Sequence, residues 1–447
     1  MKRPLLVTGI AIVLVAINLR PSMATIGPLV DRIQASTGAS NLLISLLTTL
    51  PVALIGIGAA CGRLLRTKLG EERGITTALC LIGGATLLRY FLSDGVALLI
   101  TAAVAGVGIA MTQALMTSFI KRRFGRESGR LTGLYTTSIM AGAAVSAMTA
   151  PFVAQRIGWE GAVAAWAIAA AAGLAAWTYA TRTQTAPAGP DPRDILASER
   201  GKLLNLGAAW GTSSSDDTGD LLLELSFALP TGITRRQESR EMHFLRNRRA
   251  WALMIYFGIA TAAFTLLLAW LPPFYTNLGV SESTGGLLLG GLTLVEVCAG
   301  FIVSVTIHRF PDRRKPLWLA TTLLFCGLLI LILSPLQLAI PAIVLIGLGS
   351  GAAFPLSIIL TMDHLSNPDE AGALTDFVQA GAYLIASLSP AVAGIIRDRT
   401  ADLSIAWWAM AALVLLMFLM TFSFSTSSYH RIETKDHRLP KRRRKRR

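Results

Sequence analysis

The chain has 447 residues, of which 53% are hydrophobic and 15% are charged, and its formal net charge is +15 at pH 7. Soluble globular proteins carry roughly 25% charged residues, whereas here the apolar residues form blocks of about twenty, the length that crosses a bilayer as a helix. The positive charge gathers in the last seven residues and in short loops between the blocks. This placement indicates membrane topology and argues against nucleic acid as a partner.

The apolar blocks predict an all-α polytopic membrane protein, because continuous runs of this length cross a bilayer only as helices. The first block starts like a signal peptide but continues past Arg20 and Pro21, so we expect it to remain as a span. We expect twelve transmembrane helices at about residues 5–28, 40–62, 74–92, 95–119, 129–154, 159–181, 250–275, 284–307, 316–334, 336–361, 371–396 and 403–424.

Polar segments divide these spans into two sets of six. Residues 1–181 form the expected N-terminal half, and residues 250–425 form the expected C-terminal half. Residues 182–249 are polar and contain several prolines and serines, which indicates a flexible linker. Residues 426–447 form a basic tail.

Lysine and arginine predict the orientation of the spans. The loops after the second, fourth and eighth spans are rich in these residues, whereas the loops after the seventh and ninth spans contain none. Basic loops stay in the cytoplasm, so we expect both termini and the linker there, in a bacterial inner membrane. The connection after the tenth span departs from this rule, because it is acidic and contains Asp363, Asp369 and Glu370.

The two halves repeat a pattern of small residues. Matched pairs 241 positions apart are Gly106 and Gly347, Gly108 and Gly349, and Leu115 and Leu356; pairs 239 positions apart are Gly133 and Gly372, Gly142 and Gly381, and Pro151 and Pro390. Small residues let helices approach closely in a membrane. Two parallel six-helix halves with a substrate site between them are the architecture of alternating-access transporters.

The sequence contains no constellation that suggests catalysis, a cofactor or a metal. A glycine-rich phosphate loop followed by Lys and Ser or Thr is absent, and the histidines are scattered. The four cysteines, Cys61, Cys80, Cys298 and Cys326, lack metal-ligand spacing. An enzyme within the bilayer would need a nucleophile and base, or metal ligands, inside its spans. We therefore predict a transporter and no enzyme.

Arg20 is the most informative polar residue, because it lies near the middle of the first span. A guanidinium cannot discard its proton, so it must face a cavity, a partner or an anion. Pro21 follows directly and should interrupt the helix, which frees backbone groups to line a site and makes it a candidate gating residue. A structural ion pair with a carboxylate is the alternative role for Arg20.

Four further polar residues lie inside expected spans. Glu296, in the middle of the eighth span, is a candidate for proton coupling, or for a structural partner of an arginine. Gln113 and Gln379, in the fourth and eleventh spans, either contact the substrate or form hydrogen bonds between helices. Asp376 lies one turn before Gln379, nearer the cytoplasm, and is a candidate gate or cap residue.

Several motifs bear on the family. The first span contains Asn18-Leu19-Arg20-Pro21 followed by Gly27-Pro28-Leu29. Further motifs, in chain order, are Leu47-Thr48-Thr49-Leu50-Pro51, Ile120-Lys121-Arg122-Arg123-Phe124, Ala269-Trp270-Leu271-Pro272 with Phe274-Tyr275, Gly351-Ala352-Ala353-Phe354-Pro355-Leu356, Asp363-His364 and Ala371-Gly372. In these residues the chain resembles the cyanate-transporter branch of the major facilitator superfamily, which also contains nitroimidazole exporters.

The resemblance implies the major facilitator fold and a secondary transporter that moves cyanate or a similar small solute by rocking of two halves. Arg20 would hold the negative charge of the substrate, and a proton on Glu296 would be co-transported. The residues expected to shape the cavity are Gln113, Trp270 and Gln379. A drug or metabolite exporter with the same fold is the alternative. The expected partners are a small-molecule substrate, the lipid bilayer and protons, and we expect a monomer.

Three features depart from the pattern of this branch. The linker 182–249 is longer than usual, and Glu296 stands where the branch tends to have Gln. In the loop after the second span, Arg66 stands where the superfamily signature Gly-x-x-x-Asp-Arg-x-Gly-Arg-Arg has Asp. The second departure leaves the chemistry of the substrate open, and the third leaves open the ion pair that this loop usually forms.

Overall fold

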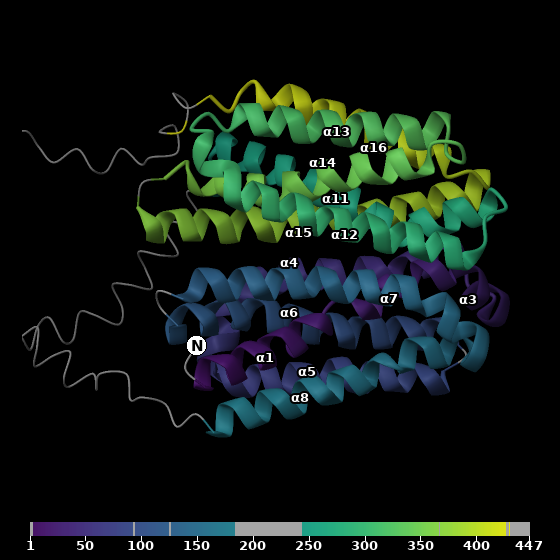
Figure 1. Ribbon diagram of the computed structural model, residues 1–447, viewed down its shortest axis with the longest axis horizontal. Helices are drawn as coiled ribbons and strands as arrows, with labels where there is room; N and C mark the ends of the chain where they lie inside the picture. Colours follow the sequence, from purple (N-terminus) through teal and green to yellow (C-terminus); the bar gives the residue numbers. More distant parts are fainter. Residues whose placement is uncertain are drawn as a thin grey trace, which may run out of the picture.

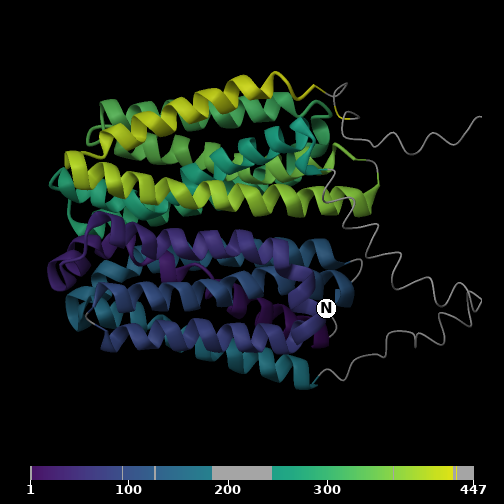
Figure 2. The same cartoon turned by 180° about the vertical axis from the view of Figure 1, so that it is seen from behind.

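The computed structural model describes residues 3–92, 94–124, 127–183, 244–365, 367–425 and 429. All regular secondary structure in these residues is helical. Figure 1 shows two groups of roughly parallel helices lying side by side, the N-terminal group in purple to blue and the C-terminal group in teal to yellow, and Figure 2 shows the same division from behind. Most of the expected linker 182–249 and of the tail 426–447 lies outside the described residues.

The N-terminal group contains eight α-helices and two short 3-10 helices in the described residues. They are α1 (Arg3–Ile17), α2 (Pro21–Ala24), η1 (Gly27–Leu29), α3 (Val30–Thr37), α4 (Asn41–Leu69), α5 (Glu71–Leu88), η2 (Arg89–Phe91), α6 (Gly95–Phe124), α7 (Ser128–Ala164) and α8 (Trp166–Thr183). We call the end of the bundle where α8 ends the linker end, and the other end the opposite end.

The C-terminal group begins at the linker end with α11. Its helices are α11 (Arg248–Asn277), α12 (Glu282–Thr306), η4 (Ile307–Arg309), α13 (Arg314–Leu333), α14 (Ala339–Met362), α15 (Pro368–Thr400) and α16 (Ser404–Thr421). The two groups meet where α4 packs against α15 and α7 packs against α12.

Eleven helical segments of the described chain are long and apolar enough to cross a membrane. The twelfth span begins after a turn inside α7. At this turn Ile157 has φ −128° and Gly158 has φ 78°. Glycine adopts a positive φ without steric cost, so the chain turns there and residues 159–183 run back as a separate sixth helix. The expected fold class, twelve helices in two six-helix halves, is therefore confirmed.

The repeated glycines lie at equivalent contacts in the two halves. A Cβ atom on Gly106 would meet α4, and one on Gly347 would meet α12, which are the second and eighth spans. A Cβ on Gly108 would meet α5, and one on Gly349 would meet α13, the third and ninth spans. The sequence repeat thus records where helices of each half approach most closely.

The first span is broken in the middle, as Pro21 predicted. Helix α1 ends at Ile17 and α2 begins with Pro21, which has no amide hydrogen to continue the hydrogen bonds of α1. Asn18 Nδ2 donates to the carbonyl of Ala169 in α8 (3.0 Å). Gly142 of α7 lies directly against the carbonyl of Ile17. Two neighbouring helices therefore hold the broken segment in place.

Ion pairs organise the linker end of each half. In the N-terminal half Arg122 pairs with the buried Glu71 (2.7 Å), and in the C-terminal half Arg313 pairs with Asp363 (2.6 Å). In the N-terminal half the basic partner, Arg122, lies at the end of the fourth span. In the C-terminal half the equivalent position, after the tenth span, carries the acidic partner, Asp363, and the basic partner lies after the eighth span. This reversed arrangement gives a structural reason for the acidic connection after the tenth span.

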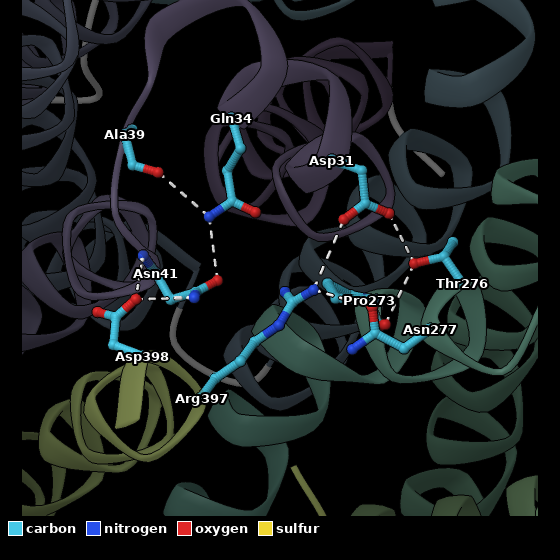
Figure 3. Close-up of polar contacts among 9 residues, drawn as sticks. All are labelled: Asp31, Gln34, Ala39, Asn41, Pro273, Thr276, Asn277, Arg397 and Asp398. Atoms are coloured by element: carbon cyan, nitrogen blue, oxygen red, sulfur yellow. Dashed lines mark hydrogen bonds and ion pairs between the residues drawn. The ribbon is translucent and has the colours of Figure 1, made fainter. Parts of the chain in front are cut away.

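Polar contacts join the two halves at the opposite end. Arg32 pairs with Glu282 (2.7 Å), and Asp398 of α15 accepts hydrogen bonds from the Asn41 side chain (2.8 Å) and from two backbone amides at the start of α4. Figure 3 shows the Asn41–Asp398 contact beside a second cluster around Arg397. The halves are therefore closed against each other at this end.

The halves diverge toward the linker end. Close to the opposite end, a Cβ on Gly394 of α15 would meet α4, and one on Gly286 of α12 would meet α7. Nearer the linker end, Gly372 of α15 and Gly133 of α7 have no atom within 4 Å of the Cβ position. These glycine contacts therefore join the halves near the opposite end, whereas the two glycines nearer the linker end face open space.

A buried histidine connects α11 and α14 through hydrogen bonds at the linker end of the C-terminal half. His364 follows α14 and is 1% exposed. Arg249 Nε donates to its Nε2 (3.1 Å), so Nδ1 carries the proton and donates to the carbonyl of Leu360 (2.6 Å). Burial lowers the pKa of His364 to about 4, and the charge of Arg249 acts in the same direction. His364 is therefore neutral at neutral pH.

Gly142→Ala should destabilise the protein, because the added methyl group would meet backbone atoms of Ile17 that cannot rotate away. Overpacking of this kind costs about 1–3 kcal/mol, so we expect a lower Tm for the purified protein. Gly133→Ala on the same helix faces open space and is the matched control, with no expected change. Equal Tm values for the two variants would contradict this account.

His364 should make stability depend on pH. The unfolded side chain has a pKa of about 6.5, so between about pH 6.5 and pH 4 only the unfolded state binds the proton. Stability is therefore lost as the pH falls through this window. We expect the decrease in Tm from pH 7 to pH 5 to be smaller in His364→Asn than in the wild type. The exposed His308 provides the control His308→Asn, which should behave as the wild type.

Candidate functional site

Arg20 lies at the break of the first span, directly before α2. Its side chain is buried, with 4% exposure of the residue, and its guanidinium stacks over the ring of Phe264 in α11, with Cζ 5.3 Å from the ring centroid. Such a stack attracts a cation by about 0.5–2 kcal/mol. Because Arg20 belongs to the N-terminal half and Phe264 to the C-terminal half, the cation lies between them.

Three more ionisable side chains surround this cation. Tyr135 of α7, Tyr383 of α15 and Glu296 of α12 lie within the range of electrostatic interaction with Arg20. All three are buried. Together with Phe264, these residues bring four helices from both halves to one place near the middle of the bundle, which we call the central site.

Buried polar atoms without partners gather at the central site. Arg20 Nε, Tyr135 Oη and Glu296 Oε2 are buried and have no hydrogen-bond partner among the described residues. Most buried polar atoms in folded proteins are hydrogen-bonded, because an unpaired one costs about 1–3 kcal/mol. One such atom on the cation and two on neighbouring side chains indicate a place for a polar ligand or water.

Glu296 makes its hydrogen bond with another residue than Arg20. Its Oε1 accepts from the Ser350 hydroxyl of α14 (2.6 Å). Within the described chain no ion pair joins Arg20 and Glu296, although they interact at longer range. In this structure the two groups therefore interact at longer range, without a direct ion pair.

The two glutamines are half-buried and make no side-chain hydrogen bond within the described residues. Gln379 lies one turn before Tyr383 on α15, so it lies on the side of the helix that approaches Arg20. Gln113 lies seven residues after Gly106 and therefore on the side of α6 that faces α4. Hydrogen bonding between helices, the alternative role, is not seen for either side chain.

Trp270 and Asp376 lie away from the central site. Trp270 is buried six residues beyond Phe264 on α11, donates from Nε1 to the carbonyl of Pro390 (3.0 Å), and stacks with Arg397. Asp376 is exposed on α15 toward the linker end. Of the residues predicted from the sequence, Arg20, Pro21 and Glu296 therefore lie at or next to the central site. Gln379 lies one helical turn from Tyr383 of that site.

Sequence reasoning missed the aromatic side chains of the central site and the arginine that supports it. Tyr135, Tyr383 and Phe264 lie in apolar spans, where an aromatic residue gives no signal of its role. Arg89 is fully buried and donates to the carbonyl of Ser22 (2.9 Å), which holds the segment after the break. A charged residue near the end of the expected third span was the signal that could have found it.

The central site brings hydrogen-bond donors and a positive charge together. It combines a permanent cation, an aromatic face and a phenol hydroxyl, with a carboxyl group nearby. No group of three or more His, Cys, Asp or Glu side chains in the described residues could hold a metal ion. A guanidinium and a phenol hydroxyl can both donate hydrogen bonds to an anion, and the central site contains no paired nucleophile and base.

Comparisons with known proteins agree with the fold. A family model of the Major Facilitator Superfamily matches residues 9–390 and 275–445. The chain is 30% identical to the cyanate transport protein CynX of Escherichia coli (strain K12), over 96% of the chain and 99% of that protein. It is 27% identical to a 2-nitroimidazole transporter of the same organism, over 93% and 94%.

Solved structures share the fold at low sequence identity. A crystal structure of a D-xylose-proton symporter matches with a TM-score of 0.69 and 14% identity, covering 94% of this chain and 98% of that one. The inward-open xylose transporter XylE from E. coli matches with a TM-score of 0.67 and 15% identity, covering 93% and 95%. These similarities concern the fold alone.

Proposed function

This chain belongs to the major facilitator superfamily and is a multi-pass secondary transporter, and we propose that its solute is a small anion such as cyanate. The observation that carries the proposal is Arg20, a permanent cation buried between the two halves and without a carboxylate partner in the described residues. Its relative CynX, a cyanate transport protein, supports the same class of solute.

The anion would bind where Arg20 and Phe264 meet. A guanidinium donates from a planar fork to two acceptor atoms, and Arg20 Nε is buried with no partner of its own. The hydroxyl of Tyr135 and the amide of Gln379, one turn before Tyr383, would provide neutral donors. Gln113, on the side of α6 that faces α4, would contribute a further polar group to the cavity.

The conformation supports alternating access between the two halves. We propose that the linker end faces the cytoplasm of a bacterial inner membrane, because the basic loops lie there. The halves are closed at the opposite end and diverge toward the linker end. In this state the central site would exchange its solute with the cytoplasm, and Pro21 and Asp376 would belong to the moving parts.

Glu296 is the proposed proton-coupling group. Moving an anion inward against an inside-negative potential costs about 2.3 kcal/mol per 100 mV, and one proton moved with it cancels this cost. Glu296 is buried near Arg20, with one oxygen bonded to Ser350 and the other unpaired. It can therefore bind a proton without losing a structural ion pair.

Export of a nitroimidazole-like compound is the second candidate function. The relative that is a 2-nitroimidazole transporter supports it, as do Phe264, Tyr135 and Tyr383, whose rings could stack on a flat aromatic solute. Cells that express the chain would then survive an added nitroimidazole better than control cells. Protection without any uptake of cyanate would favour this function over the first.

Arg20→Gln should lower the affinity for cyanate about ten- to a hundredfold, because loss of a charged hydrogen-bond partner costs about 1.5–3 kcal/mol. Arg20→Lys should also be impaired, since an ammonium lacks the planar fork and is more strongly hydrated. The measurement is the concentration dependence of labelled cyanate uptake into proteoliposomes at equal protein content.

Arg89→Gln is the matched control, because Arg89 is another buried arginine with a structural hydrogen bond to Ser22. It should lower stability and raise the half-saturation concentration of the folded fraction far less than Arg20→Gln does, because Arg89 holds the segment but does not contact the solute. If Arg20→Gln misfolds and adding Glu296→Gln restores both folding and wild-type affinity, Arg20 is a structural partner of Glu296 and the proposed anion site is wrong.

Glu296→Gln should abolish accumulation of cyanate driven by an inward proton gradient, because an amide cannot bind the transported proton. Cyanate exchange across the membrane without a gradient should persist, since the amide oxygen can still accept from Ser350. The half-buried Glu160, near the opposite end, provides the control Glu160→Gln, which should keep both activities. Full proton-driven accumulation by Glu296→Gln would exclude this coupling role.

A further inference from the structure

A second arginine stacks on the helix that carries Phe264. Arg397 of α15 lies over the ring of Trp270 in α11, with Cζ 5.3 Å from the ring centroid, the same separation as between Arg20 and Phe264. Trp270 and Phe264 are six residues apart on α11, which corresponds to about 9 Å along a helix axis. Two guanidinium groups therefore follow α11 from the opposite end toward the middle of the bundle.

Asp31 of the N-terminal half pairs with Arg397, as Figure 3 shows. Asp31 Oδ1 lies 3.7 Å from Arg397 Nη2, and its Oδ2 accepts from the Thr276 hydroxyl (2.7 Å). Arg397 Nη2 also donates to Asn277 Oδ1 (3.0 Å). The C-terminal half thus holds a carboxylate of the N-terminal half between a guanidinium and a hydroxyl.

Arg397 has more binding capacity than Asp31 uses. Its side chain is nine-tenths buried, with 10% exposure, yet its Nη1 is buried and has no hydrogen-bond partner among the described residues. The 3.7 Å separation from Asp31 is long, because charge-assisted hydrogen bonds between nitrogen and oxygen measure about 2.7–2.9 Å. A small free anion could approach this cation more closely than the tethered carboxylate does.

The neighbouring acid does not take this place. Asp398 follows Arg397 directly, but adjacent residues of a helix do not face each other. Its carboxylate accepts from the backbone amides of Asn41 and Leu42 at the start of α4. Asp31 is therefore the carboxylate that pairs with Arg397 in the present state.

We propose that Arg397, Trp270 and Asn277 form an outer anion site, which the transported anion occupies when the opposite end opens. Opening separates the halves, so Asp31 leaves with α3 while these three residues stay together in the C-terminal half. An arriving small anion then takes the place of the Asp31 carboxylate before it reaches Arg20. Since one cation serves both groups, closure by Asp31 and binding of the solute at this site exclude each other.

This inference rests on the proposed anion substrate, and a double variant tests it. The assay measures exchange of external labelled cyanate in right-side-out membrane vesicles that contain the full chain and are preloaded with cyanate. Asp31→Asn removes the competing charge, and Arg397→Gln is then added to it. Because the ion pair is already broken in Asp31→Asn, a role of Arg397 in closure alone predicts no further change.

We expect the external half-saturation concentration to rise about ten- to a hundredfold from Asp31→Asn to the double variant, the range for loss of a charged hydrogen-bond partner. Arg397→Lys in the same background should give a smaller rise, and it replaces the glutamine variant if that protein does not fold. Arg32→Gln in the Asp31→Asn background is the matched control, because Arg32 pairs with Glu282 at the same end, and it should cause no rise.

Equal half-saturation concentrations in Asp31→Asn and in its Arg397 variants would overturn the outer site, and so would an equal rise in the Arg32→Gln control. If the wild type exchanges cyanate and Arg20→Gln loses affinity while the Arg397 variants do not, the outer site alone is wrong. If the wild type exchanges no cyanate, the proposed substrate is wrong and the outer site fails with it.

Discussion

Arg20 carries a charge that it cannot lose, at the point where the first membrane span is interrupted. A charge inside a bilayer is costly, and the protein offsets this cost with the ring of Phe264 and with Tyr135, Tyr383 and Glu296 around the guanidinium. Because these groups come from both halves, the cation can stay solvated only while the halves enclose it or while a solute or water reaches it. The proposed substrate and the position of Arg20 between the halves are both consistent with this requirement.

The support of Arg20 depends on groups that do not touch a solute. Asn18, within the break, donates to the carbonyl of Ala169 in α8, Arg89 donates to the carbonyl of Ser22 after the break, and Gly142 allows α7 to lie against Ile17. Close helix contacts through glycine occur within each half, and Gly286 and Gly394 make similar contacts between the halves near the opposite end. Polar contacts such as Arg32 with Glu282 also join the halves there. Rocking of the halves would have to separate both kinds of contact.

The sequence indicated those parts of the molecule that membrane physics makes conspicuous. Arg20 and Glu296 stand out because charge is rare inside a span, and the paired glycines Gly106 and Gly347 stand out by their spacing. The partners of Arg20 could not be predicted, because Phe264 and Tyr383 resemble any other aromatic residue of an apolar helix. Contacts between residues far apart in the chain were equally hidden.

Trp270 illustrates that limit, since its motif pointed to the cavity but its partner, Arg397, depends on how α11 and α15 pack.

The central claim is that an anion binds beside Arg20, and the most direct test is a crystal of the full chain soaked with selenocyanate, a linear anion whose selenium scatters anomalously. The account predicts an anomalous peak beside the Arg20 guanidinium and the Phe264 ring, between the two halves. Peaks confined to the basic loops at the linker end, with none beside Arg20, would contradict it.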